Sequence, residues 1–281
     1  MKITITFLLV FTNLLSAQIK GVVKDSITGK PIPYVGIWTN IDSVSVSTNK
    51  KGIFEIAKTE SINEILLFPS NYIPKKIKLK NLKDEIILVP KQENTTKEKP
   101  NRNSEYIVCN EVGINKNYFS STTFSSTKLL AKYIPYQEEF NDRKFLKKIK
   151  IGLVSKSKSS IYKIRFFETD LDGKPGKEIY NSEINDEIFV GFNNIMNFEF
   201  SKEINILNKK IIFPKNGLFV VIEICYFRNN MENLIYEGKT HKILNPNIIS
   251  YNNQSQNLFE YKNGEWIKSE KNFSINLTLT N

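Results

Sequence analysis

The sequence contains 281 residues, 40% hydrophobic and 25% charged, with a formal net charge of +11 at pH 7. The single histidine excludes a zinc site that needs two histidines and a carboxylate. The length lies near the upper limit for one hydrophobic core, so we expect two domains.

The first 17 residues have the pattern of a secretory signal peptide. Lys2 precedes a mostly apolar stretch, Ile3–Leu15, and Ser16 and Ala17 supply small residues for cleavage. The stretch is short for a membrane span, so we expect cleavage before Gln18, with an uncleaved anchor as the alternative. No later segment is apolar enough for a transmembrane helix. We therefore expect export to the periplasm, the outer-membrane periphery or the extracellular space, where a basic protein meets anionic envelope polymers rather than nucleic acid.

Residues 18–90 alternate between short apolar runs and clusters of Asn, Gly, Asp and Lys, a pattern typical of strands and turns. The predicted strands are Ile19–Val23, Tyr34–Thr39, Ser43–Thr48, Ile53–Ile56, Glu64–Phe68, Lys76–Leu79 and Glu85–Val89. Asp25 and Gly29 predict a turn in a first hairpin, and Gly52 predicts the turn of a second. Phe54 and Ile56 are expected on one face of the strand that follows.

These residues resemble the carboxypeptidase-regulatory-like domain. The family pattern is matched by Gly21, Val23, Asp25, Thr28, Gly29, Pro31, Ile32, Pro33, Thr48, Gly52 and Phe54, while Asn49 replaces the usual Asp. The resemblance implies a seven-stranded, transthyretin-like β-sandwich over residues 18–90. In that family such domains occur beside carboxypeptidases and in exported envelope proteins. The resemblance is to the accessory domain and not to the peptidase.

A linker and a second domain are expected after residue 90. Residues 91–105 contain no large apolar side chain, so we expect a flexible linker, which argues against a rigid pair of domains. Residues 106–281 are expected to form a second, jelly-roll-like β-sandwich, so that the fold class is all-β with two β-sandwich domains. The region 126–133 is a weak helix candidate, and Asn263-Gly264 predicts a hairpin turn. The predicted strands are Phe145–Val154, Ile161–Thr169, Asn197–Phe200, Leu218–Phe227, Leu258–Lys262, Glu265–Lys268 and Phe273–Thr280, with Leu218–Phe227 central.

Two cysteines, Cys109 and Cys225, each lie in an apolar run. Export permits a disulfide between them, and two buried thiols are the alternative.

Residues with catalytic potential form no recognisable motif. His241 is expected in a loop without a nucleophile, and the carboxylates Glu168, Asp170 and Glu223 show no spacing that marks a pair. Asp172 and its neighbouring glycine predict a turn rather than a calcium loop. We therefore expect a protein that is not an enzyme and has no cofactor or metal.

The second domain contains a candidate ligand-binding face. Lys148 and Lys150 alternate with apolar residues in one strand, and Lys163 and Arg165 do so in the next, so a hairpin of the two would gather four cations on one sheet face. Ordinary solvation of these cations is the alternative. The C-terminal aromatics Tyr251, Tyr261 and Trp266 are candidates for stacking on a sugar ring, or for packing in the core.

These patterns together predict a non-catalytic exported protein whose partner is an envelope glycan or another envelope polymer. The alternative is a structural or adaptor protein that docks on an outer-membrane protein complex through exposed sheet edges.

Overall fold

The computed structural model describes residues 18–281 except 42–44, 92–97, 101–102, 111–119, 125–127, 155–158, 180–182, 190–198, 227–229, 252–257, 263 and 270–271. The expected signal peptide, residues 1–17, lies outside the described residues. The described part of the chain is all-β, with four sheets and three short 3-10 helices. Within it, no helix has the length and hydrophobicity needed to cross a membrane.

Residues 18–90 form two small sheets that enclose one core. The strands of the first sheet, in the order β4-β1-β7, are β4 (Ile53–Ala57), β1 (Gln18–Asp25) and β7 (Glu85–Leu88). Those of the second, in the order β3-β2-β5-β6, are β3 (Ser45–Ser47), β2 (Gly36–Thr39), β5 (Glu64–Leu67) and β6 (Lys75–Lys78). Val23 and Phe54 from the first sheet meet Ile37 and Leu67 from the second in this core. The arrangement is that of a β-sandwich.

The two N-terminal turns connect strands of different sheets, so β1 does not pair with β2 and β3 does not pair with β4. The first predicted hairpin is confirmed only as a short bridge, in which Lys24 pairs with Pro31. The local turn chemistry is as expected, because Asp25 Oδ1 accepts hydrogen bonds at 2.7 Å from the amides of Ile27 and Thr28, and Gly29 has φ +66°. The Thr48 hydroxyl then accepts from the Val35 amide at 2.8 Å and donates to the Ile32 carbonyl at 2.9 Å. These bonds turn the chain out of the first sheet before β2 begins.

The C-terminal part contains two larger sheets. The seven-stranded sheet has the order β13-β12-β16-β10-β19-β20, with β14 also paired to β12. Its strands are β10 (Lys128–Ile134), β12 (Ser159–Thr169), β13 (Pro175–Glu178), β14 (Ile184–Phe189), β16 (Leu218–Ile224), β19 (Leu258–Lys262) and β20 (Glu265–Lys268). The eight-stranded sheet has the order β17-β18-β11-β22-β8, with β15 paired to β11 and both β21 and β9 to β18. Its strands are β8 (Tyr106–Asn110), β9 (Ser120–Phe124), β11 (Phe145–Val154), β15 (Glu199–Asn205), β17 (Met231–Tyr236), β18 (Lys239–Tyr251), β21 (Asn272–Phe273) and β22 (Ile275–Thr280).

Both faces of the seven-stranded sheet are covered. One face packs on the eight-stranded sheet through a large apolar core, and the other contacts Trp38 and Phe68 of the N-terminal part. Every residue of β16 is buried, which confirms that this strand is central. The weak helix candidate at 126–133 is wrong, because residues 128–134 form the strand β10. Both faces of β10 are covered, so the strand carries apolar residues on both faces. Its sequence therefore lacks the alternation of apolar and polar residues by which a strand is recognised.

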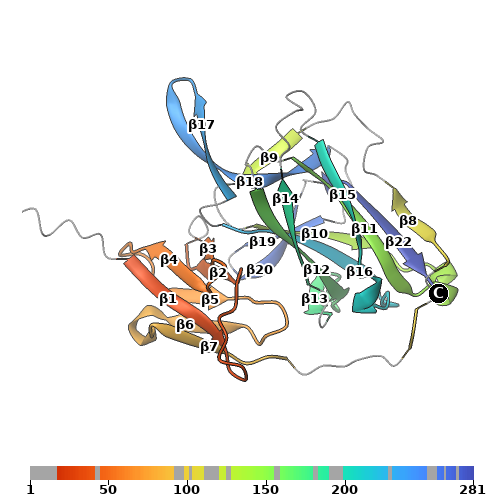
Figure 1. Ribbon diagram of the computed structural model, residues 1–281, viewed down its shortest axis with the longest axis horizontal. Helices are drawn as coiled ribbons and strands as arrows, with labels where there is room; N and C mark the ends of the chain where they lie inside the picture. The colour runs from red at the N-terminus through yellow and green to blue at the C-terminus, as the bar shows by residue number, and fades with distance from the viewer. Residues whose placement is uncertain are drawn as a thin grey trace, which may run out of the picture.

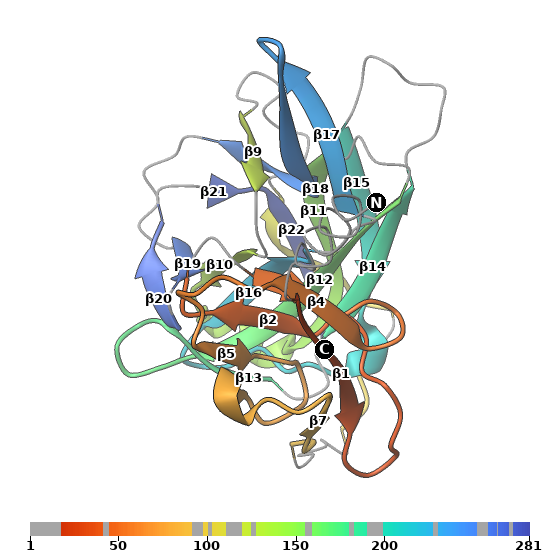
Figure 2. The ribbon, with the colours of Figure 1, turned by 90° about the vertical axis from the view of Figure 1, so that its left-hand side faces the viewer.

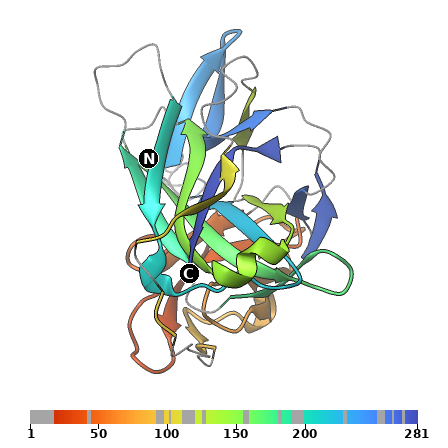
Figure 3. The ribbon, with the colours of Figure 1, turned by 90° about the vertical axis from the view of Figure 1, so that its right-hand side faces the viewer.

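The N-terminal sheets lie against the seven-stranded sheet, on the side of β19, β20 and β12 (Figures 1 and 2). From the opposite side the eight-stranded sheet faces the viewer and the N-terminal strands lie behind it (Figure 3). The hairpin of β17 and β18 projects from the rest of the molecule (Figure 1). His241 is paired with Leu234 in this hairpin, so the expected loop position of His241 is wrong.

Both ends of the expected linker contact the C-terminal part. Lys91 Nζ lies 3.2 Å from Glu178 Oε2, and the Ser104 carbonyl accepts a hydrogen bond at 3.0 Å from Lys147 Nζ. Glu105 pairs with Lys147 at 3.1 Å and with Lys148 at 2.9 Å. The flexibility was expected of the residues between these ends, eight of which lie outside the described residues.

Candidate functional site

The four cations of the predicted ligand-binding face do not share a sheet face. β11, which carries Lys148 and Lys150, pairs with β15, β18 and β22, whereas β12, which carries Lys163 and Arg165, pairs with β13, β14 and β16. The alternation within each strand is as predicted, with the apolar side chains buried in the core between the sheets. The prediction of a hairpin is wrong because each strand finds its partners among distant segments.

Lys148 and Lys150 lie on the outer face of the eight-stranded sheet, beside carboxylates. Lys148 Nζ is 2.9 Å from Glu105 and 3.1 Å from Glu203, and Lys150 is in register with Glu203. The hydrogen bond that Lys148 donates to Glu105 raises the pKa of Lys148, and the same bond lowers the pKa of Glu105. Neighbouring carboxylates therefore offset the charge of Lys148 without a ligand, and Lys150 has Glu203 as its cross-strand neighbour.

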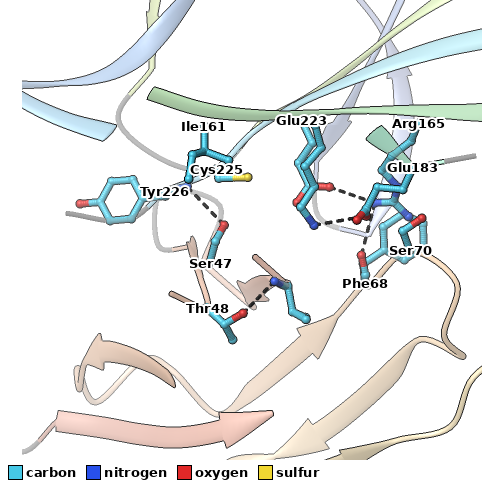
Figure 4. Close-up of polar contacts among 12 residues, drawn as sticks. Ser47, Thr48, Phe68, Ser70, Ile161, Arg165, Glu183, Glu223, Cys225 and Tyr226 are labelled. Atoms are coloured by element: carbon cyan, nitrogen blue, oxygen red, sulfur yellow. Dashed lines mark hydrogen bonds and ion pairs between the residues drawn. The ribbon is translucent and has the colours of Figure 1, made fainter. Parts of the chain in front are cut away.

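Arg165 is fully buried at the contact between the N-terminal and C-terminal parts (Figure 4). Its Nε and Nη2 donate to the two carboxylate oxygens of Glu178 at 2.8 and 3.0 Å, and Nη1 lies 3.1 Å from Glu223 Oε2. Nη1 also donates to the Phe68 carbonyl at 3.3 Å, and the guanidinium carbon lies 4.6 Å from the Phe68 ring centroid. Arg165 thus joins two carboxylates of the seven-stranded sheet to the N-terminal part.

Lys163 and the N-terminal part complete this buried ionic cluster. Lys163 Nζ is 3.4 Å from Glu183 and 3.9 Å from Glu223. The Ser70 hydroxyl and Lys91 both donate to Glu178. The prediction of an exposed face is therefore wrong for Lys163 and Arg165, which are 2% and 0% exposed.

The two carboxylates that Arg165 binds differ in their electrostatics. Burial raises the pKa of Glu178, but the bidentate Arg165 outweighs burial and the pKa lies below its ordinary value. Burial raises the pKa of Glu223, and here the cations Lys163 and Arg165 do not outweigh it. Glu223 Oε1 also has no hydrogen-bond partner among the described residues. Glu223 is therefore the less compensated carboxylate of the cluster.

Gly36 allows β2 to pass directly over Glu223. A Cβ atom at Gly36 would lie 2.9 Å from Glu223 Oε1 and 2.4 Å from the ring of Trp38. Nearby, the Tyr226 amide donates to the Ser47 hydroxyl at 3.3 Å (Figure 4), and the Ser47 amide donates to the Tyr226 carbonyl at 2.8 Å. These bonds link the end of β3 to the segment after β16. The contact between the two parts is therefore made by main chain as well as by side chains.

The cysteines are not joined by a disulfide. Cys109 lies half-buried in β8 of the eight-stranded sheet, and Cys225 is buried just after β16 of the other sheet. The disulfide prediction is therefore wrong, and the alternative of two buried thiols is confirmed for Cys225 only. Burial raises the pKa of the Cys225 thiol. A buried thiol with a raised pKa is a poor nucleophile.

The three candidate aromatics have different positions. The Tyr261 ring stacks on Phe68 with centroids 5.3 Å apart, so it is part of the contact between the two parts, and its proposed exposure to a sugar is wrong. Burial raises the pKa of Tyr261. Tyr251 ends β18 in the eight-stranded sheet, and its side chain lies outside the described residues. Trp266 belongs to the same aromatic cluster as Tyr261, at 5.1 Å between centroids, and is as buried as Tyr261, at 8% exposed, but it also lines a groove.

This groove has a volume of about 590 Å³ and opens at the β19–β20 end of the seven-stranded sheet. It is lined by side chains of β10, β19 and β20 and by the loop between β12 and β13: Tyr133, Thr169, Asp172, Gly173, Lys174, Phe259, Trp266, Ile267 and Lys268. Hereafter it is called the aromatic groove. Its volume lies in the range of small-molecule sites, about 300–1,000 Å³.

Strand register and a fixed loop position the side chains of the aromatic groove. Lys268 is the cross-strand neighbour of Phe259, so both side chains emerge from one face of the sheet. The hairpin between β19 and β20 is the one predicted from Asn263-Gly264, and Gly264 has φ +87°. On the other side, Asp170 Oδ1 accepts from the amides of Asp172 and Lys174 at 3.0 and 2.7 Å, which closes the predicted turn.

The polar groups of the aromatic groove are available for a ligand. Thr169 Oγ1 is buried and has no hydrogen-bond partner among the described residues. Asp172, Lys174 and Lys268 are exposed, and none of them forms an ion pair with a described residue. The sequence indicated Trp266 and the two turns, but not their proximity, which depends on the strand order β12-β16-β10-β19-β20.

The remaining acidic and histidine candidates do not gather into a site. Glu168 is exposed, Asp170 is bound in its turn and Glu223 is in the ionic cluster. Among the residues that the structure describes, no group of three His, Cys, Asp or Glu side chains is placed to hold a metal ion. The side chain of His241 is not described.

Comparison of the chain with family models, with curated proteins and with solved structures finds no match.

Proposed function

We propose that this protein is a non-catalytic binding protein that holds a saccharide in the aromatic groove. The observation that carries the proposal is one groove of about 590 Å³ that is lined by the half-buried Tyr133 ring, by the mostly buried Phe259 and Trp266 rings, and by polar groups with no partner among the described residues. Aromatic rings offer flat apolar surface, and hydroxyl, carboxylate and ammonium groups fix orientation through hydrogen bonds. A sugar ring, with an apolar face and an edge of hydroxyls, uses both.

We propose further that the protein is exported and that residues 18–90 form a carboxypeptidase-regulatory-like domain beside a second β-sandwich domain. The three-stranded and four-stranded sheets of these residues, with a common core, support the first domain. The Asp25 turn and the Thr48 hydroxyl support it as well, because these pattern residues make the bonds that shape the connections. In this proposal the N-terminal domain supports the groove indirectly, by packing on Trp266 and its neighbours.

Titration of residues 18–281 with a panel of neutral and acidic oligosaccharides tests the proposal, with intrinsic fluorescence as the readout. Trp38 and Trp266 are the two tryptophans of the chain, and stacking of a sugar on Trp266 is expected to change the emission. Asp172→Asn and Thr169→Val are expected to weaken binding by about tenfold, because each removes one or more hydrogen bonds to the ligand.

The matched control is Asp142→Asn, which removes an exposed carboxylate at the end of a 3-10 helix outside the groove. It is expected to leave binding unchanged. Absence of binding across the panel, or equal binding by Asp172→Asn, Thr169→Val and Asp142→Asn, would overturn the proposal.

One observation favours the adaptor alternative. β17 is an edge strand in the order β17-β18-β11-β22-β8, and its residue Ile235 is 74% exposed. An edge strand with an exposed apolar residue is suited to strand addition by a protein partner. Replacing residues 233–242 by a two-residue turn would abolish capture of an outer-membrane protein complex under this alternative, and would leave saccharide binding intact under the first proposal.

A further inference from the structure

Two exposed cations, Lys174 and Lys268, line the aromatic groove, and like other exposed lysines such as Lys215 and Lys239 they form no ion pair with a described residue. Many lysines of this protein face a carboxylate: Lys20, Lys24, Lys76, Lys91, Lys144, Lys147, Lys148, Lys163 and Lys262 all form ion pairs. Lys174 and Lys268 form none with a described residue, although both line the groove. Their charge is therefore available to a ligand.

The positions of Lys268 and Lys174 also place their charges beside the groove. Lys268 emerges beside Phe259 on the groove side of the sheet, and Lys174 closes the loop whose other members, Asp172 and Gly173, also line the groove. Apolar rings line the groove together with the two lysines, so an anionic ligand bound there would contact both. Two lysines and one aspartate give the lining a net charge of +1.

From this arrangement we infer that the ligand is an acidic saccharide with one carboxylate per bound sugar, a hexuronate unit. This inference rests on the proposed saccharide function and names its ligand class. The carboxylate is bound by Lys174 and Lys268, the ring stacks on the aromatic side chains, and Asp172 and Thr169 bind ring hydroxyls. Asp172 disfavours groups of higher negative charge, such as clustered sulfates, because a like charge close to the anion is repulsive.

A matched pair of probes tests the charge alone. A hexuronic acid oligosaccharide and its carboxyl-reduced form have the same linkages and rings, and they differ only in the carboxylate. Fluorescence titration at low salt is expected to give about tenfold tighter binding of the acidic form, since two exposed ion pairs contribute modestly. The advantage is expected to shrink severalfold at high salt, because these lysines are exposed to screening.

Lys174→Gln and Lys268→Gln are each expected to remove most of this preference and to leave binding of the reduced form unchanged. Lys239→Gln, an exposed lysine on the β17–β18 hairpin, is the matched control and is expected to retain the preference.

Equal affinity for the acidic and the reduced forms would overturn this inference and leave the saccharide proposal standing. Tighter binding of the acidic form that persists in both lysine variants would overturn the assignment to Lys174 and Lys268. Binding of neither form, with binding of a neutral sugar from the panel, would overturn the acidic class. Binding of no sugar at all would overturn both proposals together.

Discussion

Arg165 is the residue on which the stability of the buried ionic cluster depends most. It is 0% exposed, and its guanidinium satisfies Glu178 through two bonds and Glu223 through one. Removing one partner of a buried ion pair leaves an uncompensated charge, which costs far more than the pair contributes in net terms. The stability of the contact between the two parts therefore depends on this side chain.

Arg165→Met is expected to lower the free energy of unfolding by about 3–5 kcal/mol, because Glu178 and Glu223 lose their bidentate and single partners. Urea unfolding followed by circular dichroism measures the change. Lys148→Met is the matched control: it removes a cation from more exposed ion pairs, which solvent screens, and is expected to cost much less than Arg165→Met. Equal losses for the two variants would contradict this account of the cluster.

Glu223 is expected to make the free energy of unfolding decrease as the pH rises. Its folded pKa is raised, so the folded state binds the proton more tightly than the unfolded state does. Its stabilising contribution is present below the ordinary pKa of 4.5 and is lost as the pH rises through the folded pKa. Glu178, with a lowered pKa, acts oppositely and stabilises only above its folded pKa.

Glu223→Gln removes the first of these contributions. The free energy of unfolding of both proteins is measured at several pH values between 4.5 and 8. The value for the wild type minus the value for the variant is expected to fall as the pH rises. A difference that is constant with pH would show that Glu223 does not titrate with a raised pKa.

At the scale of the element, β2 is the strand that brings the N-terminal part onto the ionic cluster. Gly36→Ala is expected to destabilise the protein by about 1–3 kcal/mol, because its Cβ would overlap Trp38 and crowd Glu223. It is also expected to shift tryptophan emission. Gly29→Ala places a Cβ in open space at φ +66°, so about 1–2 kcal/mol of backbone strain and no emission change are expected. Similar emission for both variants would argue against the close approach of β2.

Strands and turns were largely predictable from the sequence, whereas strand pairing was not. The period of two in β12 correctly placed Tyr162 and Phe166 in the core, and the Asn263-Gly264 signal correctly placed a hairpin. The same period suggested that Lys163 and Arg165 face solvent, because alternating cations usually do. Glu223, a carboxylate within an otherwise apolar central strand, was the available signal that a buried cation must lie beside it.

The aromatic groove was less predictable than the strands for the same reason. Its residues come from positions between 133 and 268 and meet only through the order of the seven-stranded sheet. Registers between distant strands are set by packing over the whole sheet, and a local sequence pattern carries little information about them.

At the scale of the whole molecule, the two parts are joined by an aromatic cluster and an ionic cluster as well as by the chain. Cleavage at a protease site inserted within residues 92–97 is therefore expected to leave the two fragments associated, because the contacts of Phe68, Trp38 and Arg165 do not depend on the connection. Size-exclusion chromatography of the cleaved protein measures this. Separate elution of intact, folded fragments would show that the contact depends on the connecting chain.

Trp266 belongs both to the aromatic cluster between the two parts and to the wall of the groove. In evolutionary terms its indole is constrained twice under the proposed saccharide function, because a change would disturb both the contact between the two parts and the wall of the groove. Lys174 and Lys268 carry no such double constraint, since they are exposed at the rim. Under the proposed saccharide function, divergent descendants of this protein are therefore expected to acquire new ligand preferences by exchanging Lys174 and Lys268, while Trp266 and the contact between the two parts stay unchanged.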